Sequence, residues 1–293
     1  MKIVSATIFF VICSNIPAYS EEKKLLPGEI DVTHWMPTET CEVFYTSLKR
    51  IAENKDLKVL LEKYQALIPM ELGISIENAH SLLKAKSSGD VGHVTIIQGD
   101  KAINAESCKK QQPKEVKYGF FMYYQLKNDA GFAHFPADGT VVLAVNENTM
   151  QQLLDNPNKS TISDVVKAGL AHALPFDIFE LSTGLSAKRF LDPKANEFSL
   201  TTSLKGTLIG DKICMMVRIS TFDSEDDAKE MLSAAEKGLE QVLQPAKEML
   251  ADSKISELER KQIQQFLEAA NVTSSNKTIT TRMFMPVKAL LYP

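Results

Sequence analysis

Two adjoining runs of alternating residues constrain the fold of this chain more than any other feature. The run "EFSLTTSLKGTLI" (197–209) is followed by the pair Gly210-Asp211 and then by "KICMMVRIS" (212–220). In an extended strand, the alternating apolar residues of each run fall on one face; they are Phe198, Leu200, Leu204, Leu208, Ile213, Met215, Val217 and Ile219. Alternation of this length on either side of a turn pair predicts an antiparallel β-hairpin.

The earlier half of the chain contains a similar pattern. "GHVTIIQ" (92–98) predicts a strand, and "GFAHF" with "TVVLAV" predicts a hairpin around Asp138-Gly139. "EVKYGFFMYYQL" (115–126) alternates throughout and predicts a single long strand. Helical spacing of apolar residues predicts helices between 48 and 67 and a short helix over 75–83.

These patterns predict an α+β fold of two modules, each an antiparallel sheet with helices packed on one face. The polar segment "DNPNKS" (155–160) separates an N-terminal module at 41–155 from a C-terminal module at 161–293, and residues 21–40 are expected to be a linker. In the second module we expect a helix from Thr161 to His172, helices at about 225–250 and 254–270, and a closing strand near 277–285. Pro245 is expected to kink or break the first helix of that pair. The shared plan leaves open a diverged duplication.

The first twenty residues have the features of an export signal. Lys2 precedes an apolar run over 3–12, and Ala18-Tyr19-Ser20 forms a cleavage pattern of small residues. We therefore predict a signal peptide cut before Glu21, and a mature protein in the periplasm or outside the cell. An uncleaved membrane anchor is the alternative, but the run is short for a span of about 20 apolar residues. No later segment is long enough to cross a membrane.

Composition excludes some classes of function. The chain has a formal net charge of −4 and no cluster of basic residues, which argues against binding to nucleic acid. In an oxidising compartment Cys41 and Cys108 could pair in a disulfide, whereas Cys214 lies in an apolar strand and is expected to be a buried thiol. The cysteine spacings match no zinc pattern, and the sequence predicts no cofactor and no metal ligands.

Catalytic motifs are weak or absent. The histidines form no short ligand pair, although His93 and His134 lie on strands that could be neighbours and could form a zinc or catalytic site. Histidines on the surface of a sheet explain them better. Ser81 and Lys84 match the S-x-x-K motif of penicillin-recognising enzymes, but the companion motifs of that class are missing. We assign no catalytic residue and favour a protein that is not an enzyme.

The acidic stretch "TFDSEDDAKEML" (221–232) allows two interpretations. A calcium loop beginning at Asp223 would require glycine and glutamate where the chain has Ala228 and Ala234. A helix start fits better, because Asp223 or Ser224 can cap the helix and acidic residues are favourable at a helix N-terminus.

Phe121 and Tyr123 give the 115–126 strand a second aromatic face. Either the strand is central in a sheet and packed on both sides, or these residues form a binding face for a partner.

Three segments of the chain resemble those of a loose group of uncharacterised exported bacterial proteins of two α+β modules. They are "PTETCEVFYTSLKRIAENKDLKVLLEKY" (37–64), "GFAHFPADGTVVLAV" (131–145) and "DKICMMVRISTFDSEDDAKEML" (211–232). The resemblance implies the two-module fold and carries over no activity and no functional residue.

The leading functional hypothesis from the sequence is an exported, non-catalytic binding or assembly protein whose partner is another protein. The alternative is a periplasmic or secreted hydrolase whose site is assembled from distant residues, with His93, His134 and a carboxylate. No stable membrane span is expected after signal cleavage, and the oligomeric state is left open.

Overall fold

The computed structural model describes residues 32–37, 39–55, 57–87, 92–155, 178–182, 195–208, 211–252 and 255–286. The predicted signal peptide, most of the predicted linker, the segment 156–160 and the helix predicted from Thr161 to His172 lie outside these residues. Across the described ranges, no helix is both long and apolar enough to cross a membrane.

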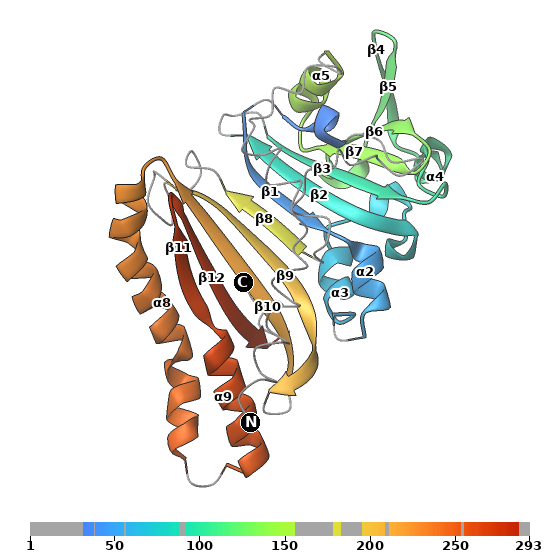
Figure 1. The fold of residues 1–293 in the computed structure, drawn as a ribbon. Coiled ribbons are helices and arrows are strands. Elements are labelled where there is room, and N and C mark those ends of the chain that lie inside the picture. Colours follow the sequence, from blue (N-terminus) through green and yellow to red (C-terminus); the bar gives the residue numbers. More distant parts are fainter. Residues whose placement is uncertain are drawn as a thin grey trace. The chain divides into compact units, whose positions relative to one another are not determined.

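The strands of the described residues form a twelve-stranded sheet in which every pairing is antiparallel (Figure 1). The strand order is β11-β12-β10-β9-β8-β1-β2-β3-β7-β6-β5-β4. In chain order the strands are β1 (Thr40–Thr46), β2 (Ala79–Ser87), β3 (His93–Gly99), β4 (Lys114–Tyr118), β5 (Phe121–Gln125), β6 (Phe132–Ala137), β7 (Thr140–Ala144), β8 (Ile178–Ser182), β9 (Ala195–Leu208), β10 (Asp211–Phe222), β11 (Asn271–Ser275) and β12 (Thr278–Pro286).

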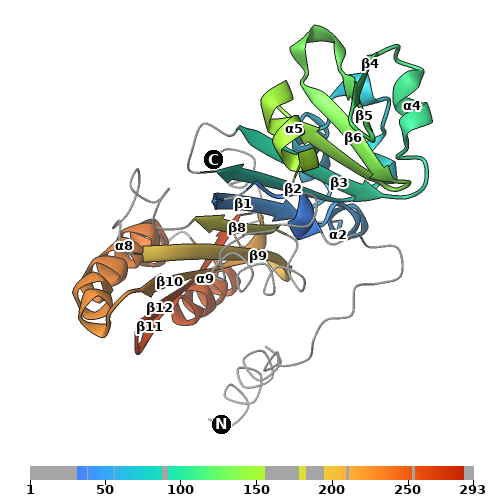
Figure 2. The same cartoon turned by 90° about the horizontal axis from the view of Figure 1, so that it is seen from above.

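Helices cover parts of this sheet (Figure 2). They are η1 (Val32–Trp35), α2 (Leu48–Glu53), α3 (Leu60–Gln65), η2 (Met70–Leu72), η3 (Ile76–Asn78), α4 (Ala105–Lys109), η4 (Lys127–Asp129), α5 (Glu147–Asp155), α8 (Glu225–Ala251) and α9 (Glu257–Ala269). The α+β class predicted from the sequence is confirmed. The strands of the two predicted modules join through the β1–β8 pair, in which Val43 lies opposite Leu181.

The N-terminal strands are buried on both faces. Leu82 of β2, Ile97 of β3 and Val141 of β7 lie on one face and pack in the main core cluster with residues of α2 and α3. Ile96 and Val142 are also buried, but neighbouring residues of a strand point to opposite faces. The second face is covered by α5, which contacts β6 and β7. Helices therefore cover both faces of these strands, and not one as expected. Consistent with this, all of β7 is buried.

Two local predictions in this region are wrong. The helix expected over 75–83 is only the single turn η3, after which the chain forms β2. Leu82 and Leu83 are consecutive residues of β2, so they project from opposite faces, and both are buried because both faces of β2 are covered. The long strand expected over 115–126 is instead two strands, β4 and β5, joined by a turn at 119–120.

The C-terminal strands and helices follow the sequence pattern closely. The long β9–β10 hairpin is present, and α8 and α9 lie within a few residues of their predicted ends. Helix α8 continues through Pro245, so the predicted break is absent. A small core of Phe222, Ala228 and Ile279 lies between α8 and the strands. The short strand β11 beside β12 was not predicted.

Candidate functional site

The acidic stretch after β10 is a helix start, as the sequence indicated. The Ser224 hydroxyl oxygen accepts a hydrogen bond from the Asp227 backbone N–H at 3.1 Å and donates one to the Asp227 carboxylate at 2.6 Å. Glu225, Asp226 and Asp227 occupy the first turn of α8, where the partial positive charge of the helix N-terminus stabilises carboxylates. These residues therefore have a structural role.

His93 and His134 do not form a common site. Across β7, His134 lies opposite Val142, which lies opposite Ile96 of β3. His93 is an odd number of positions from Ile96 and therefore projects from the other face of the sheet. His93 is exposed, whereas His134 is buried. The described residues contain no cluster of three or more histidine, cysteine, aspartate or glutamate residues that could hold a metal ion.

Ser81 and Lys84 lie on β2 and not on a helix. In a helix they would share a face, but in a strand residues three positions apart project from opposite faces. Partial burial lowers the pKa of Lys84, which lies between Phe44 of β1 and Thr95 of β3. The geometry that the S-x-x-K motif requires is therefore absent.

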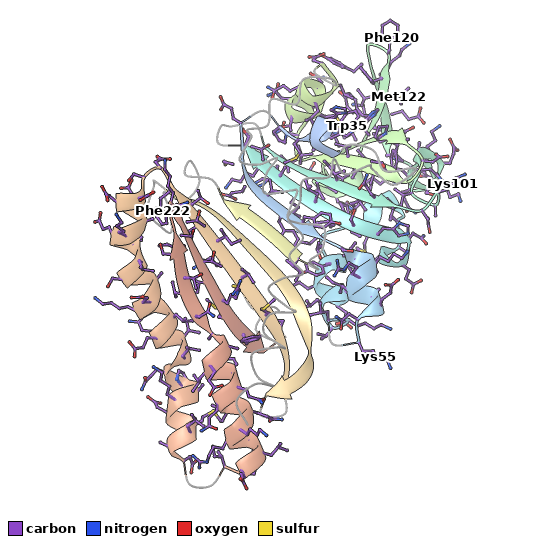
Figure 3. The ribbon with its side chains drawn as sticks, viewed as in Figure 1. Trp35, Lys55, Lys101, Phe120, Met122 and Phe222 are labelled. Atoms are coloured by element: carbon purple, nitrogen blue, oxygen red, sulfur yellow. The ribbon has the colours of Figure 1, made fainter. Side chains whose placement is uncertain are left out.

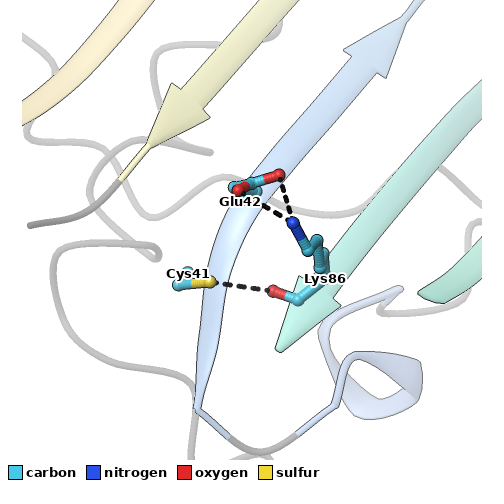
Figure 4. Close-up of polar contacts among 3 residues, drawn as sticks. All are labelled: Cys41, Glu42 and Lys86. Carbon is cyan, nitrogen blue, oxygen red and sulfur yellow. Dashed lines mark hydrogen bonds and ion pairs between the residues drawn. The ribbon is translucent and has the colours of Figure 1, made fainter. Parts of the chain in front are cut away.

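The candidate disulfide between Cys41 and Cys108 is not formed. Cys41 lies on β1, and its thiol is 3.5 Å from the backbone carbonyl oxygen of Lys86, whose side chain pairs with Glu42 (Figure 4). Cys108 is a free, buried thiol in α4, and burial raises its pKa to about 11. Cys214 is buried in β10, as expected from its apolar strand, and its pKa is also raised to about 11 by burial.

The aromatic segment singled out in the sequence forms the β4–β5 hairpin at one end of the sheet. Tyr118 pairs with Phe121, which leaves Gly119 and Phe120 as a two-residue turn. Gly119 has φ +58°, a conformation that a tight hairpin turn requires at its first position and that glycine adopts without strain. β5 pairs with β6 only at Tyr124 and Gln125, so the hairpin extends beyond the neighbouring strand (Figure 1).

Side-chain contacts anchor the base of this hairpin. Tyr123 is completely buried; its hydroxyl donates to the Glu147 carboxylate of α5 at 2.5 Å and accepts from the Gln151 amide at 3.2 Å. Burial, followed by the hydrogen bond to Glu147, raises the pKa of Tyr123. The Tyr118 hydroxyl donates to Asp155 at the end of α5 at 2.9 Å. Tyr123 is therefore part of the core and not of an accessible binding face.

His134 provides a second anchor. Its Nδ1 lies 2.8 Å from the Met122 carbonyl oxygen and donates to it, because a carbonyl oxygen only accepts. The His134 ring packs between Trp35, with ring centroids 5.3 Å apart, and Phe121, at 5.9 Å with the rings edge to face. Burial lowers the pKa of His134, which keeps the ring neutral near pH 7. Phe121 is half-buried in this contact.

The tip of the hairpin exposes the residues that the sequence analysis missed. Phe120 is fully exposed, at 104% of its reference area, and it is the only aromatic among the large apolar side chains that are exposed in the described residues. Met122 is exposed on the adjoining strand (Figure 3). Gly119 was the available signal: a glycine within an alternating run marks a turn, and a turn there places Phe120 at a tip instead of in a strand.

No family model matches the chain, and neither does any curated protein. The fold is similar to solved structures described as TP0453. Crystal form I aligns with a TM-score of 0.51 at 10% sequence identity, covering 90% of this chain and 96% of that one. Crystal form IV aligns with a TM-score of 0.50 at 9% identity over the same shares. Identity this low shows a common fold alone.

Proposed function

We propose that this chain is an exported, non-catalytic binding protein that engages a partner protein through the tip of the β4–β5 hairpin. The observation that carries the proposal is the exposure of Phe120. Large aromatic side chains supply much of the contact energy in protein interfaces. An isolated exposed aromatic at a two-residue turn costs nothing to the fold and can enter a pocket of a partner.

The anchoring of the hairpin supports the same role. Tyr123 and His134 hold its base against α5 and β6, so the strand that presents Phe120 is fixed before binding. A preorganised contact residue loses less conformational entropy on binding than a residue on a mobile loop. Met122, at 39% exposure, extends the apolar surface of the tip. Its flexible thioether side chain adapts to irregular surfaces.

The alternative, a hydrolase using His93 and His134, has no support from the geometry. The two side chains project from opposite faces of the sheet. His134 is buried, and its Nδ1 donates a hydrogen bond to the Met122 carbonyl oxygen. The proposal therefore assigns both residues no chemical role.

Site-specific photo-crosslinking tests the proposed binding. A photoreactive amino acid replaces Phe120 in the full chain, in cells that naturally produce the protein, and a second variant carries it in place of Met70. Met70 is a matched control because it is 84% exposed but lies in η2, outside the hairpin. We expect a discrete adduct with protein from position 120 and none from position 70. Equal yields at the two positions, or no adduct at 120, would contradict the proposal.

Export rests on the leader and has its own test. If the signal peptide is cut as proposed, the N-terminal residue of the mature protein is Glu21. Edman sequencing or intact mass of the protein recovered from the natural source gives this residue directly. A chain that retains Met1 and stays in the cytoplasmic fraction would contradict the export part of the proposal.

A further inference from the structure

The outer edge of β4 presents backbone hydrogen-bonding groups in a regular order, and no strand of the described residues pairs with them. β4 is the last strand in the sheet and pairs with β5 on one side. No described strand pairs with its other side. In a hairpin with a two-residue turn, the closing pair exchanges both backbone hydrogen bonds, and alternate residues do the same along the ladder. Tyr118, Val116 and Lys114 therefore direct their backbone groups to β5. Glu115 and Lys117 direct theirs to the open edge.

We infer that β4 pairs antiparallel with β4 of a second copy of this chain, about a twofold axis at Val116. This inference rests on the proposed function and names the partner as a second copy. In this register Glu115 of each copy lies opposite Lys117 of the other. These two residues have the outward-pointing backbone groups, so each such pair exchanges both hydrogen bonds. Their side chains form two identical pairs of opposite charge. Such self-complementarity is the requirement of a twofold interface.

The charges select this register over its neighbours. Shifting the axis to residue 115 places two glutamates opposite each other, and shifting it to 117 places two lysines opposite each other. Like charges directly opposite in a sheet are destabilising, whereas opposite charges stabilise by roughly 0.2–1 kcal/mol per pair. If the axis instead lay midway between two residues, outward-pointing backbone groups of one copy would lie opposite inward-pointing backbone groups of the other. The pattern Lys-Glu-Val-Lys-Tyr over 114–118 thus favours a single alignment.

The surroundings of β4 are compatible with a second copy. Lys114, Glu115 and Lys117 are exposed, and Val116 and Tyr118 are half-buried. Lys109 lies 3.8 Å from Glu115 in the same copy, and both side chains are well exposed, so this contact is weak and competes little. Exposed charges on an edge strand discourage pairing with arbitrary strands. On β4 the charges disfavour pairing with most strands, but they are complementary to those of an antiparallel second copy of β4.

The same register also covers the tip of the hairpin. Beyond Tyr118, the alignment carries Phe120 of one copy alongside Gln112 and Pro113 of the other. The fully exposed ring would then lose contact with water on one side. A five-residue strand pair buries little area, so we expect a weak, concentration-dependent dimer that is further weakened by salt.

Charge reversal with restoration tests the register. Sedimentation equilibrium of the full mature chain should show a reversible dimer. Lys117→Glu makes both side-chain pairs glutamate–glutamate, and Glu115→Lys makes both lysine–lysine, so each single variant should raise the dimer Kd about tenfold or more. The double variant Glu115→Lys/Lys117→Glu restores opposite charges and should dimerise like the wild type.

Mixing the two single variants gives a second, independent measurement. A copy with Glu115→Lys presents two lysines, and a copy with Lys117→Glu presents two glutamates, so the mixture should form a heterodimer that neither variant forms alone. Unchanged melting temperatures exclude misfolding as the cause.

Each result decides the inference. A wild type that stays monomeric at every accessible concentration overturns it, and so does a dimer whose Kd is unaffected by the single variants. If the wild type is monomeric and position 120 crosslinks to a different protein, the self-pairing inference fails while the proposed function stands. If no adduct forms at 120 and the chain is monomeric, both fail.

Discussion

The two ends of the sheet are both hairpins with two-residue turns, but they differ in what the turn contacts. At the β11–β12 end, the Lys277 carbonyl oxygen accepts from the Phe222 N–H at 2.9 Å, and Lys277 Nζ donates to the Asp223 carbonyl oxygen at 2.7 Å. At the β4–β5 end, a methyl group added to Gly119 would meet no atom within 4 Å, and Phe120 is fully exposed. One turn is attached to the start of α8, and the other is free.

This difference indicates that the β11–β12 edge stabilises the fold, whereas the β4–β5 edge is available for contacts with a partner. The residues next to the β11–β12 turn join a core with Ala228 and Phe222, so their apolar side chains stabilise the fold. The base of β4–β5 is anchored through Tyr123 and His134, whereas Phe120 at its tip and the charged residues of its outer strand are exposed and make only exposed contacts within the described residues. An apolar side chain at the first turn should therefore be costly to remove, and one at the second should not.

Truncation at the two hairpins should give the largest contrast. Ile279→Ala removes a side chain that is 3% exposed, and we expect a loss of about 2 kcal/mol or more in the free energy of unfolding. Phe120→Ala should change it by less than about 0.5 kcal/mol, because the ring contacts little. Urea denaturation of both variants measures this. Comparable losses would mean that the tip of β4–β5 packs on the fold in solution.

Two tyrosines define where the anchoring of β4–β5 ends. Tyr123→Phe removes a buried hydroxyl and its short hydrogen bond to Glu147, which keeps the longer one from the Gln151 amide at 3.5 Å, so we expect a loss of about 1 kcal/mol. Tyr118→Phe removes a solvent-exposed hydrogen bond to Asp155 and should leave stability unchanged within error. Thermal melts at neutral pH compare the variants, which differ from wild type by one oxygen atom each. An equal loss in both would place the anchor nearer the tip.

Ser224 tests how far the β11–β12 end depends on the start of α8. Ser224→Ala removes the acceptor for the Asp227 N–H and should destabilise the protein by about 1 kcal/mol. Ser224→Thr keeps a hydroxyl that can accept from the Asp227 N–H and donate to the Asp227 carboxylate, so it serves as the control and should retain most of the stability. Calcium should leave the melting temperature of the wild type unchanged. A clear rise with calcium would restore the cation-site interpretation of this stretch.

The smallest effect is expected from acidification at the base of β4–β5. Burial lowers the pKa of His134 from its usual 6.5, so below about pH 6.5 the unfolded chain takes up a proton that the folded chain does not. Stability should therefore decrease as the pH falls from 6.5 toward the folded pKa. Nδ1 donates to the Met122 carbonyl oxygen in either protonation state, which limits the loss.

The control for this prediction is His134→Gln, which cannot titrate but retains a side-chain amide donor. Its unfolding free energy should lack the component of pH dependence that wild type shows as the pH falls below about 6.5. The same slope in both proteins would assign the acid sensitivity to other groups.

Much of the fold follows from local patterns. The β9–β10 and β6–β7 hairpins, the capped start of α8 and the helix α9 were all predicted, because alternation, turn residues and capping residues act over a few positions. The errors at 75–83 and 115–126 have different causes. Whether a short apolar segment such as 79–83 is a helix or a strand depends on what pairs with it, and β2 has strands on both sides. In 115–126 the signal was local, because Gly119 within the alternating run marks a turn.

The sequence by itself determined the elements whose signals are local: the β9–β10 and β6–β7 hairpins, the capped start of α8, and the charge order Lys-Glu-Val-Lys-Tyr on β4. Only the tertiary structure decided which of them are exposed. Tyr123 and Phe120 are both aromatic, three positions apart in one segment, yet one is completely buried and the other completely exposed. The turn at Gly119 and the contacts of α5 with β6 and β7 separate them, because burial depends on residues that are distant in sequence and close in space.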